Sequence, residues 1–408
     1  MLFARNVLTD GKLRASVGVT GNQKIGDYTW QGLYTTHNSN YAGEVVVMNS
    51  TLANNDLGWE RTIQYNVGLD LTFFRGRILL NADAYIKDTD DLLFNAPLPG
   101  YTGFTKRSMN FGAIRNQGFE LGISTVNVDS RKFRWDTNFN IGVNRNEITA
   151  LADGADVLYS TRGIYGLARV GEPVGVFYGW RALGVYASDS DNTWTDPETG
   201  ATRPVKKGTP NGDPFKGGDM IWDDINSDGV INDDDRVIIG NPHPDFTGGF
   251  GTTLSWNGLS LNVYFTFSYG NEIINSQRRL RNKMGQVMNF GTDALDRWRK
   301  QGDVTDFPML CYGDAMDNFR PSTFTVEDGS YLRLKDVSLS YSLPRSVCRK
   351  IKVNDLTISL TGSNLLLWSN YSGYDPEVNT SDTAVITGLD DGAFPKSRTW
   401  GIGVNLTF

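Results

Sequence analysis

Apolar and polar residues alternate along much of this chain, which is the pattern of a β-strand with two different faces. In the segment Leu259–Tyr269 every second residue is apolar or aromatic, and most of the residues between them are Ser, Asn or Thr. The final segment alternates in the same way up to a terminal Phe408. The pattern predicts roughly 12 strands. It is clearest at residues 133–144 and 259–269 and in the final segment, 399–408. Weaker alternation occurs at residues 13–20, 65–73, 78–87, 119–126, 337–341 and 356–361, and further segments lie near 174–186 and 248–256.

The connections between these predicted strands are of two kinds. Short polar turns follow some strands, at Arg75-Gly76, Asp129-Ser130-Arg131 and Asn257-Gly258. Long polar segments follow others, notably residues 188–219 and 365–395. Short turns on one side and long loops on the other are typical of an antiparallel transmembrane β-barrel.

A soluble β-sandwich also has strands with one apolar face, so the alternation alone leaves both folds open. Two features favour the barrel. Two of the clearest strands reach 11 residues or more, whereas strands of soluble proteins are typically about 5–6 residues long. The polar faces are rich in Asn, Ser, Thr and Gly, as a water-filled lumen requires, and aromatic residues lie near strand ends, where membrane interfaces attract them. These are Trp135, Trp256, Trp400 and Phe408.

Composition narrows the class of protein further. The 408 residues contain no apolar run of 18 or more, so no transmembrane helix is predicted. The formal net charge of −7 disfavours nucleic-acid binding, which needs a concentrated basic surface. Two Cys and two His are too few for a disulfide framework or a Cys/His metal cluster. Residues 1–6 lack the features of a secretory signal, and we expect the chain to be a fragment whose signal lies upstream.

Residues 271–300 interrupt the alternation. Helix-forming residues around 277–281 and 294–298 predict short helices within a long loop that spans residues 271–330. A basic cluster in this segment is formed by Arg278, Arg279, Arg281 and Lys283. We expect it to be a solvated face paired with the acidic loop described next, with binding of an acidic partner as the alternative.

One motif carries the chemistry of a metal site. It lies in the other long loop, residues 188–245, and fits the calcium-loop pattern D-x-N-x-D-G with an acidic residue at the last position. Calcium prefers several oxygen ligands, and this spacing directs alternate side chains and one carbonyl inward around a glycine turn. The predicted ligands are Asp224, Asn226, Asp228, the carbonyl of Val230, and Asp235, with Gly229 at the turn. We expect a single structural Ca²⁺, and no cofactor is otherwise required.

Several motifs together resemble the SusC/RagA family of TonB-linked outer-membrane transporters. The resemblance spans nearly the whole chain. Each motif is weak evidence alone, but the set of motifs in this order is highly specific. They are residues 13–23 (LRASVGVTGNQ), 59–62 (WERT), 66–70 (NVGLD), 91–93 (DLL), 115–121 (RNQGFEL), 171–175 (GEPVG), 331–337 (YLRLKDV) and 371–377 (YSGYDPE).

The resemblance implies a fold, a location and partners. It implies that residues 1–408 are the C-terminal part of a 22-stranded, plugged barrel in the outer membrane, with the plug and N-terminal domains absent. It implies import of large solutes, glycan or peptide, driven by TonB acting through the absent N-terminal part. A SusD-like lipoprotein is the implied extracellular partner. The final strand resembles the signal that the barrel-assembly machinery recognises.

Two other classes of function compete with transport. A soluble or surface-bound carbohydrate-binding β protein is the alternative. In an importer whose solute is a glycan, Trp180, Tyr186 and Trp194 would stack on sugar rings, although surface or girdle packing is the simpler role for them. An outer-membrane hydrolase would need a base, for which His243 is the candidate, but the flanking prolines favour a turn before a strand. We therefore expect a transporter and not an enzyme.

Overall fold

The computed structural model describes residues 7–23, 27–41, 43–98, 100–104, 106–110, 112–151, 154, 156–161, 163–283, 289–381 and 385–408. Residues 1–6, where the sequence lacks the features of a secretory signal, lie outside this part. Most of the structure consists of strands, and the longest of them form one sheet.

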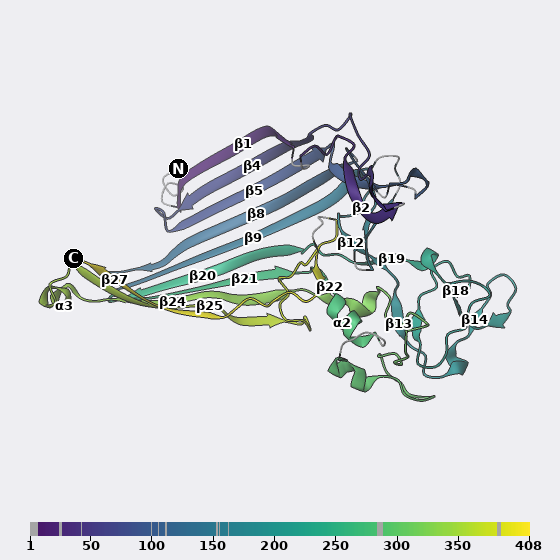
Figure 1. Ribbon diagram of the computed structural model, residues 1–408. Helices are drawn as coiled ribbons and strands as arrows, with labels where there is room; N and C mark the ends of the chain where they lie inside the picture. Colours follow the sequence, from purple (N-terminus) through teal and green to yellow (C-terminus); the bar gives the residue numbers. More distant parts are fainter. Residues whose placement is uncertain are drawn as a thin grey trace.

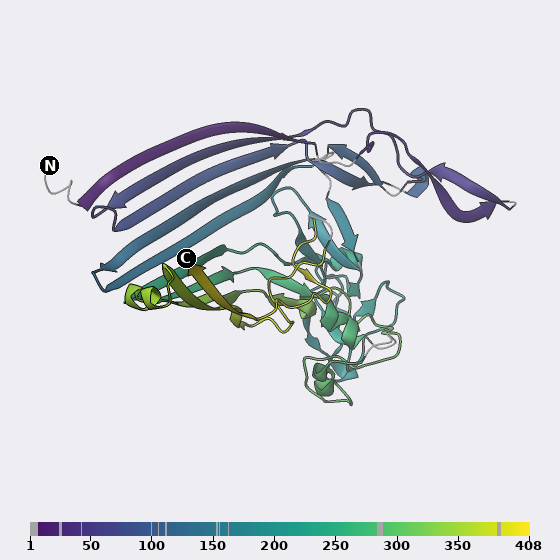
Figure 2. The same ribbon diagram turned by 60° about the vertical axis from the view of Figure 1, so that its left-hand side comes forward.

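Ten long strands form a single antiparallel sheet. Figure 1 shows them side by side, and Figure 2 shows that the sheet is curved. Within the described part of the chain, β1 pairs with β4 alone and β27 with β25 alone, so these two strands are the edges. In spatial order the strands are β1 (Leu8–Asn22), β4 (Glu60–Phe73), β5 (Ile78–Asp90), β8 (Ala113–Asp129), β9 (Phe133–Ala150), β20 (Phe246–Trp256), β21 (Leu259–Tyr269), β24 (Tyr331–Ser342), β25 (Asp355–Ser369) and β27 (Thr399–Thr407).

The strand register places apolar and polar residues on opposite faces of this sheet. Because side chains alternate between faces, residues paired across neighbouring strands share a face. One row across the last six strands reads Trp135, Leu254, Leu261, Leu339, Leu360 and Ile402. The adjacent row reads Asp136, Thr253, Asn262, Ser338, Thr361 and Gly401. The first face keeps large apolar side chains exposed, for example Ile402 at 80% and Val404 at 66%.

Charged residues on the polar face are paired within the sheet. Arg14 contacts Asp70 at 2.8 Å and Asp83 at 2.9 Å, so that one guanidinium bridges three neighbouring strands. Paired charges are compatible with a wet surface and incompatible with a hydrocarbon one.

Short and long connections separate to opposite ends of the sheet. The turns at Arg75-Gly76 and Asn257-Gly258 have positive φ angles at both residues, as tight hairpins with right-handed twist require. The helix α3 (Arg345–Lys350) lies in the connection between β24 and β25 at the same end. All the long connections leave from the other end (Figure 1).

The long connections contain short strands and helical turns. The smaller sheets pair β2 (Tyr34–Tyr41) with β3 (Glu44–Asn49), and β6 (Leu93–Pro97) with β7 (Lys106–Asn110), near η1 (Gly100–Thr102). The connection from β9 to β20 contains β10 (Val157–Thr161), β11 (Ile164–Ala168), β12 (Val176–Gly179), β13 (Ala182–Val185), η3 (Asp189–Asp191), β14 (Trp194–Thr195), β15 (Thr202–Arg203), β16 (Lys206–Lys207), β17 (Met220–Trp222), β18 (Val230–Ile231), η4 (Asp233–Asp235) and β19 (Val237–Gly240).

The two remaining long connections contain fewer strands and helical turns. Between β21 and β24 lie β22 (Glu272–Asn275), α2 (Ser276–Asn282), η5 (Thr292–Asp296), η6 (Thr323–Thr325) and β23 (Val326–Asp328), and between β25 and β27 lies β26 (Leu389–Asp390). The short helices predicted for residues 271–300 are therefore confirmed.

The described residues of the last three long connections pack into one structure, here called the loop body. Its cores contain the most buried apolar residues of the chain, including Ile164, Phe177 and Ile386 in one cluster and Met220 and Ile231 in another. Figure 2 shows the loop body to one side of the curved sheet, at the end where the long connections leave. The loop body is thus a folded unit held at one end of the sheet.

One predicted strand is wrong. Residues 174–186 were expected to form a long strand of the main sheet, but they form the two short strands β12 and β13 of the loop body. Alternation there reflects burial between other loop segments. The long connection consequently begins after Ala150, not at residue 188. No helix among the described residues is long and apolar enough to span a membrane.

Candidate functional site

The Asp-rich loop, residues 224–235, follows β17 and ends in η4. Asp224 accepts hydrogen bonds from the backbone N–H groups of Asp228 at 3.2 Å and Gly229 at 2.7 Å. The side-chain oxygen of Asn226 also accepts from the Asp228 N–H, at 3.1 Å, and Asp228 accepts from the N–H of Val230 at 2.8 Å. Gly229 has a φ of +74°, which costs glycine little. The first predicted ligands therefore share one tight turn.

The second half of the Asp-rich loop folds back on the first. Asp235 is fully buried and accepts hydrogen bonds from the N–H groups of Ile225 at 3.0 Å and Asn232 at 2.8 Å. Burial raises the pKa of Asp235, and the negative charges of Asp224 and Asp228 raise it further. The last predicted ligand therefore lies close enough to the first ones to interact with them electrostatically.

The carbonyl of Val230 is the predicted backbone ligand. In the parallel pair of β16 and β18, the carbonyls of Gly229 and Ile231 accept from the N–H groups of Lys206 and Gly208. Carbonyls point alternately to the two sides of a strand, so that of Val230 points away from β16. Among the described residues, no group of three or more His, Cys, Asp or Glu side chains is arranged so that it could hold a metal ion. The calcium site stays a prediction.

Next to the Asp-rich loop, two arginines stack on aromatic rings. The guanidinium of Arg236 lies 4.5 Å from the ring centre of Tyr165 and 4.7 Å from that of Trp180. The guanidinium of Arg320 lies 4.9 Å from the ring centre of Trp180 and 4.8 Å from that of Trp222. Such contacts are strongest with Trp and with desolvated cations. The contacts of Arg320 join the connection from β9 to β20 with the connection from β21 to β24.

The three aromatic residues considered for sugar stacking have packing roles. Trp180 and Tyr186 are buried in the core of the loop body, at 7% and 6% exposure. The indole N–H of Trp180 donates to the carbonyl of Asn232 at 2.7 Å. Trp194 is half-buried beneath the guanidinium of Arg203, 4.6 Å from its ring centre. These rings are therefore occupied by protein contacts.

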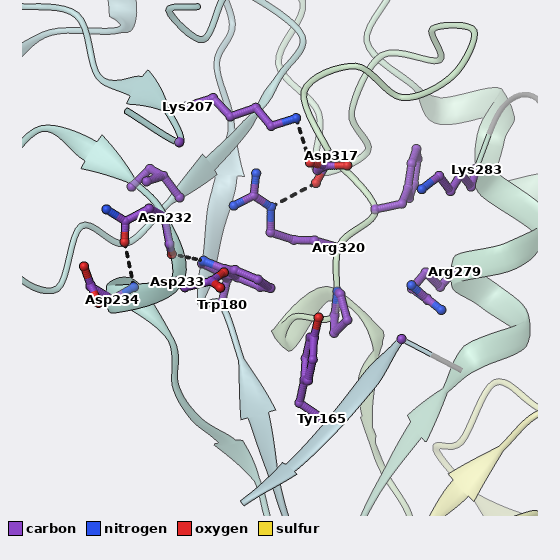
Figure 3. A pocket seen from close by; sticks show the side chains of 15 residues that line it. Tyr165, Trp180, Lys207, Asn232, Asp233, Asp234, Arg279, Lys283, Asp317 and Arg320 are labelled. Atoms are coloured by element: carbon purple, nitrogen blue, oxygen red, sulfur yellow. Dashed lines mark hydrogen bonds and ion pairs between the residues drawn. The ribbon is translucent and has the colours of Figure 1, made fainter. Parts of the chain in front are cut away.

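A pocket of about 600 Å³ opens between these segments. Figure 3 shows Arg279 and Lys283, from the region of α2, on one side and the residues around η4 on the other, with Arg320 between them. The charged residues that line the pocket are Lys207, Asp233, Asp234, Arg279, Lys283, Asp317 and Arg320. The predicted basic cluster and the predicted acidic loop thus face one another across a pocket.

The residues of the basic cluster do not form one continuous surface. Arg278 turns away from the pocket and lies 3.4 Å from Asp293 and 3.9 Å from Glu327, with its guanidinium over Phe324. Arg279 lines the pocket, and burial lowers its pKa. Arg279 and Lys283 therefore line the same pocket as Asp233 and Asp234 of the acidic loop, but the prediction of a solvated face is wrong for Arg279, which is desolvated by burial.

Three pocket residues, Tyr165, Lys207 and Arg320, are not predicted from the sequence. Arg320 donates from Nε to the carbonyl of Asp317 at 3.1 Å and from Nη2 to that of Met316 at 3.2 Å. Burial lowers the pKa of Arg320 to about 10, so it is still a cation at neutral pH. Lys207 pairs with the Asp317 carboxylate at 2.6 Å. These residues are far apart in sequence, and no local pattern marks them.

His243, the candidate base of the hydrolase alternative, is held by backbone contacts. Its Nε2 lies 2.7 Å from the carbonyl oxygen of Val174, and its own N–H donates to the side chain of Asn241 at 3.0 Å. These hydrogen bonds give His243 a structural role, because they link the turn before β20 to the loop body.

Two sequence motifs noted above meet at the junction of sheet and loop body. Arg333, in β24, is 3% exposed and contacts Asp375 at 2.5 Å and Glu377 at 2.8 Å. Lys396 contacts Glu377 at 2.8 Å. The motifs at residues 331–337 and 371–377 therefore form one buried ionic network that ties the last long connection to the polar face.

Comparison with known proteins shows which family has this architecture. Residues 6–365 match the family model described as TonB dependent receptor-like, beta-barrel. The TonB-dependent receptor P26 of Formosa agariphila is 35% identical over 422 residues, which cover 100% of this chain and 41% of that protein. The TonB-dependent receptor SusC of Bacteroides thetaiotaomicron is 27% identical and matches 99% of this chain and 38% of its own length.

Solved structures agree with these relatives. The structure of the RagAB peptide transporter aligns with a TM-score of 0.79 at 27% identity, covering 99% of this chain and 41% of the other. The chain thus spans about two fifths of the length of the proteins it matches. In the outer membrane, the apolar face of the sheet is the lipid-facing side. The chain belongs to the TonB-dependent receptor β-barrel family, is of the SusC/RagA type, and forms part of an outer-membrane barrel.

Proposed function

We propose that this chain is the loop-bearing part of a TonB-dependent importer that takes large solutes, glycans or peptides, across the outer membrane. The observation that carries the proposal is the combination of a lipid-facing apolar surface, a polar inner face with paired charges, and a folded loop body at one end. A polar inner face with a folded loop body at one end suits the capture and passage of hydrophilic solutes.

The partners in this proposal act at different parts of the receptor. TonB engages the portion of the receptor that this chain does not span. A SusD-like lipoprotein covers the loop body from outside, and the SusC and RagAB relatives support this arrangement. The final strand β27, with its exposed row Trp400, Ile402 and Val404, is the segment that the barrel-assembly machinery engages.

Uptake by intact cells tests the proposal. Cells with and without the gene are grown on panels of glycans and of peptides as the limiting nutrient, and a strain without TonB serves as the energy control. We expect one class of large solute to support growth only when both the gene and TonB are present. Equal growth of all three strains on every large solute of both panels would contradict import by this receptor.

We also propose that the Asp-rich loop binds one structural Ca²⁺ through Asp224, Asn226, Asp228, the Val230 carbonyl and Asp235. The spacing supports this, and so does the buried Asp235 beside two further carboxylates. Because burial raises the folded pKa of Asp235, ionising it costs stability as the pH rises above about 4, the ordinary Asp value. The metal-free loop carries that cost in full above the raised pKa, and a bound cation would offset it.

Terbium luminescence measures this site directly. The ring of Trp194 packs against Gly229, close enough to sensitise an ion held by the loop. We expect Tb³⁺ luminescence that Ca²⁺ displaces, a roughly tenfold or greater loss of affinity in Asp228→Asn, and no change in the exposed control Asp213→Asn. Affinity should fall on acidification, starting above the pH at which an ordinary Asp takes up its proton. Luminescence that Asp228→Asn leaves unchanged would refute the site.

A further inference from the structure

The helix α3 lies in a strongly basic connection at the short-turn end of the sheet (Figure 1). This segment, residues 343–354, is here called the α3 connection, and it contains four cations and neither Asp nor Glu. The cations are Arg345, Arg349, Lys350 and Lys352, and all four are exposed. None of them has an ion-pair partner among the residues that the structure describes. Their charges are therefore available to a partner outside the chain.

The other short connections at this end are basic as well. They are residues 74–77, 130–132 and 257–258, and they contain no Asp or Glu. Their cations are Arg75, Arg77, Arg131 and Lys132. Fewer carboxylates lie near this end, those of Asp10, Asp129, Asp355 and the last residue, Phe408. The short-turn end is therefore positive, although the whole chain has a net charge of −7.

The lipid-facing surface of the sheet reaches the α3 connection. On the apolar face Tyr341, near the end of β24, is paired with Leu259 of β21 and Ile358 of β25. Trp256 of β20 belongs to the same row and is 58% exposed. Tyr and Trp gather where the hydrocarbon of a membrane meets its headgroups. This row therefore marks the membrane interface, and α3 begins shortly beyond it, at Arg345.

The α3 connection also exposes apolar side chains. Val347 is 40% exposed and Ile351 is 50% exposed, whereas Cys348 between them is buried. Residues four apart lie on one side of a helical turn, so Val347 and Ile351 share a side. For the same reason Arg345 and Arg349 share another side. Apolar side chains next to long cations suit a membrane interface, where the former contact acyl chains and the latter reach headgroups.

We propose that the α3 connection binds the anionic headgroup of a phospholipid in the inner leaflet of the outer membrane. Short turns of outer-membrane barrels face the periplasm, so this connection meets the inner leaflet. Clusters of roughly four to eight Lys and Arg beside a membrane-spanning segment attract anionic lipids. The exposed Val347 and Ile351 favour a lipid over a water-soluble acidic protein. This inference does not depend on the solute that the receptor imports.

Lipid binding is measured by native mass spectrometry of the whole receptor that carries this chain, purified in detergent and stripped of lipid. The probes are dioleoyl phosphatidylglycerol, which is anionic, and dioleoyl phosphatidylcholine, which has the same acyl chains and no net charge. Hexaglutamate is a water-soluble polyanion for comparison. We expect phosphatidylglycerol to bind roughly tenfold or more tightly than phosphatidylcholine, and hexaglutamate not to bind at the concentration that saturates phosphatidylglycerol.

Variants assign the binding to the α3 connection. Arg349→Gln combined with Lys350→Gln should weaken phosphatidylglycerol binding roughly tenfold or more and leave phosphatidylcholine unchanged. Arg299→Gln combined with Lys300→Gln is the matched control, because it removes the same two residue types from exposed positions in the loop body. It should change neither lipid.

Further variants cover the fold and the apolar contacts. Unheated gel samples show whether each variant is folded. If the double variant fails to fold, Arg345→Gln alone should weaken phosphatidylglycerol binding about fivefold. Ile351→Ser should weaken both lipids alike, because its side chain would contact acyl chains and not headgroups.

Three results would overturn the proposal. Equal affinity for the two lipids would mean that headgroup charge is not recognised. A preference for phosphatidylglycerol that Arg349→Gln with Lys350→Gln leaves intact would place the lipid elsewhere on the receptor. Hexaglutamate binding as tight as that of phosphatidylglycerol, and lost in the same double variant, would assign the α3 connection to a soluble acidic partner.

Discussion

Replacing Arg333 by Met is expected to lower the free energy of unfolding by about 3–5 kcal/mol, the largest effect we predict for a single residue. The substitution removes the cation that pairs with Asp375 and Glu377 where the last long connection meets β24. Asp375 is 7% exposed, so it would remain as a buried charge without its strongest partner. The measurement is urea-induced unfolding of the detergent-solubilised receptor, followed by tryptophan fluorescence.

A triple variant distinguishes the effect of losing the ionic interactions from the effect of losing the volume that the three side chains fill. Buried ion pairs can often be replaced by apolar residues of similar size without loss of stability. Arg333→Met combined with Asp375→Leu and Glu377→Met should therefore recover most of the stability that the single variant loses. If Arg333→Met alone unfolds at the same urea concentration as the wild type, the network contributes nothing to stability.

The network also gives stability a dependence on pH. Burial by itself would raise the pKa of Glu377, but the hydrogen bond from Lys396 and the charge of Arg333 outweigh it and lower the pKa. A folded pKa below the unfolded value means that the stabilisation is present above the unfolded pKa and is lost as the pH falls through the folded one. Acid should therefore weaken the attachment of the last long connection.

Replacing Leu360 by Arg is expected to cost about 2–4 kcal/mol, because the side chain would enter the hydrocarbon region. Leu360 lies on the apolar face of β25, paired with Leu339 on one side and Ile402 on the other. Its neighbour Thr361 points to the opposite, polar face. Thr361→Arg is the matched control and should have a much smaller effect, since an arginine there stays in water.

The readout for this pair is the amount of folded receptor in isolated outer membranes, scored by its altered mobility in unheated gel samples. Leu360→Arg should reduce the folded fraction strongly and Thr361→Arg only slightly. Equal losses for the two variants would mean that both faces of β25 have the same environment, which would contradict the assignment of a lipid face.

The sequence predicted the sheet well because its signal is local. The segment Leu259–Tyr269 alternates from end to end, and β21 has the same bounds. Residues 133–144 alternate up to their end, and β9 continues to Ala150, because pairing with β8 extends the strand beyond the alternating pattern. Residues 174–186 misled the prediction because burial within the loop body can also produce short stretches of alternation.

The pocket was much less predictable. The Asp-rich loop and the basic cluster of α2 were both recognised, since each is a run of similar residues. The sequence does not predict that Arg320 and Trp180, which lie far apart along the chain, contact one another. Likewise Arg333 and Asp375 each belong to a recognised motif, but their ion pair depends on how the last long connection returns to the sheet. Pairings between distant loops are set by tertiary packing, which leaves no periodic trace in sequence.

The most direct test of the account is the environment of successive residues along β25. Nitroxide labels are placed singly at Ile358, Ser359, Leu360 and Thr361, in a receptor whose Cys311 and Cys348 are replaced by Ala, and the protein is reconstituted into lipid. We predict that collisions with oxygen, which concentrates in lipid, are frequent at residues 358 and 360, and that collisions with a water-soluble nickel complex are frequent at 359 and 361. Equal access of the nickel complex to all four positions would contradict a membrane-spanning sheet with one lipid face and one wet face.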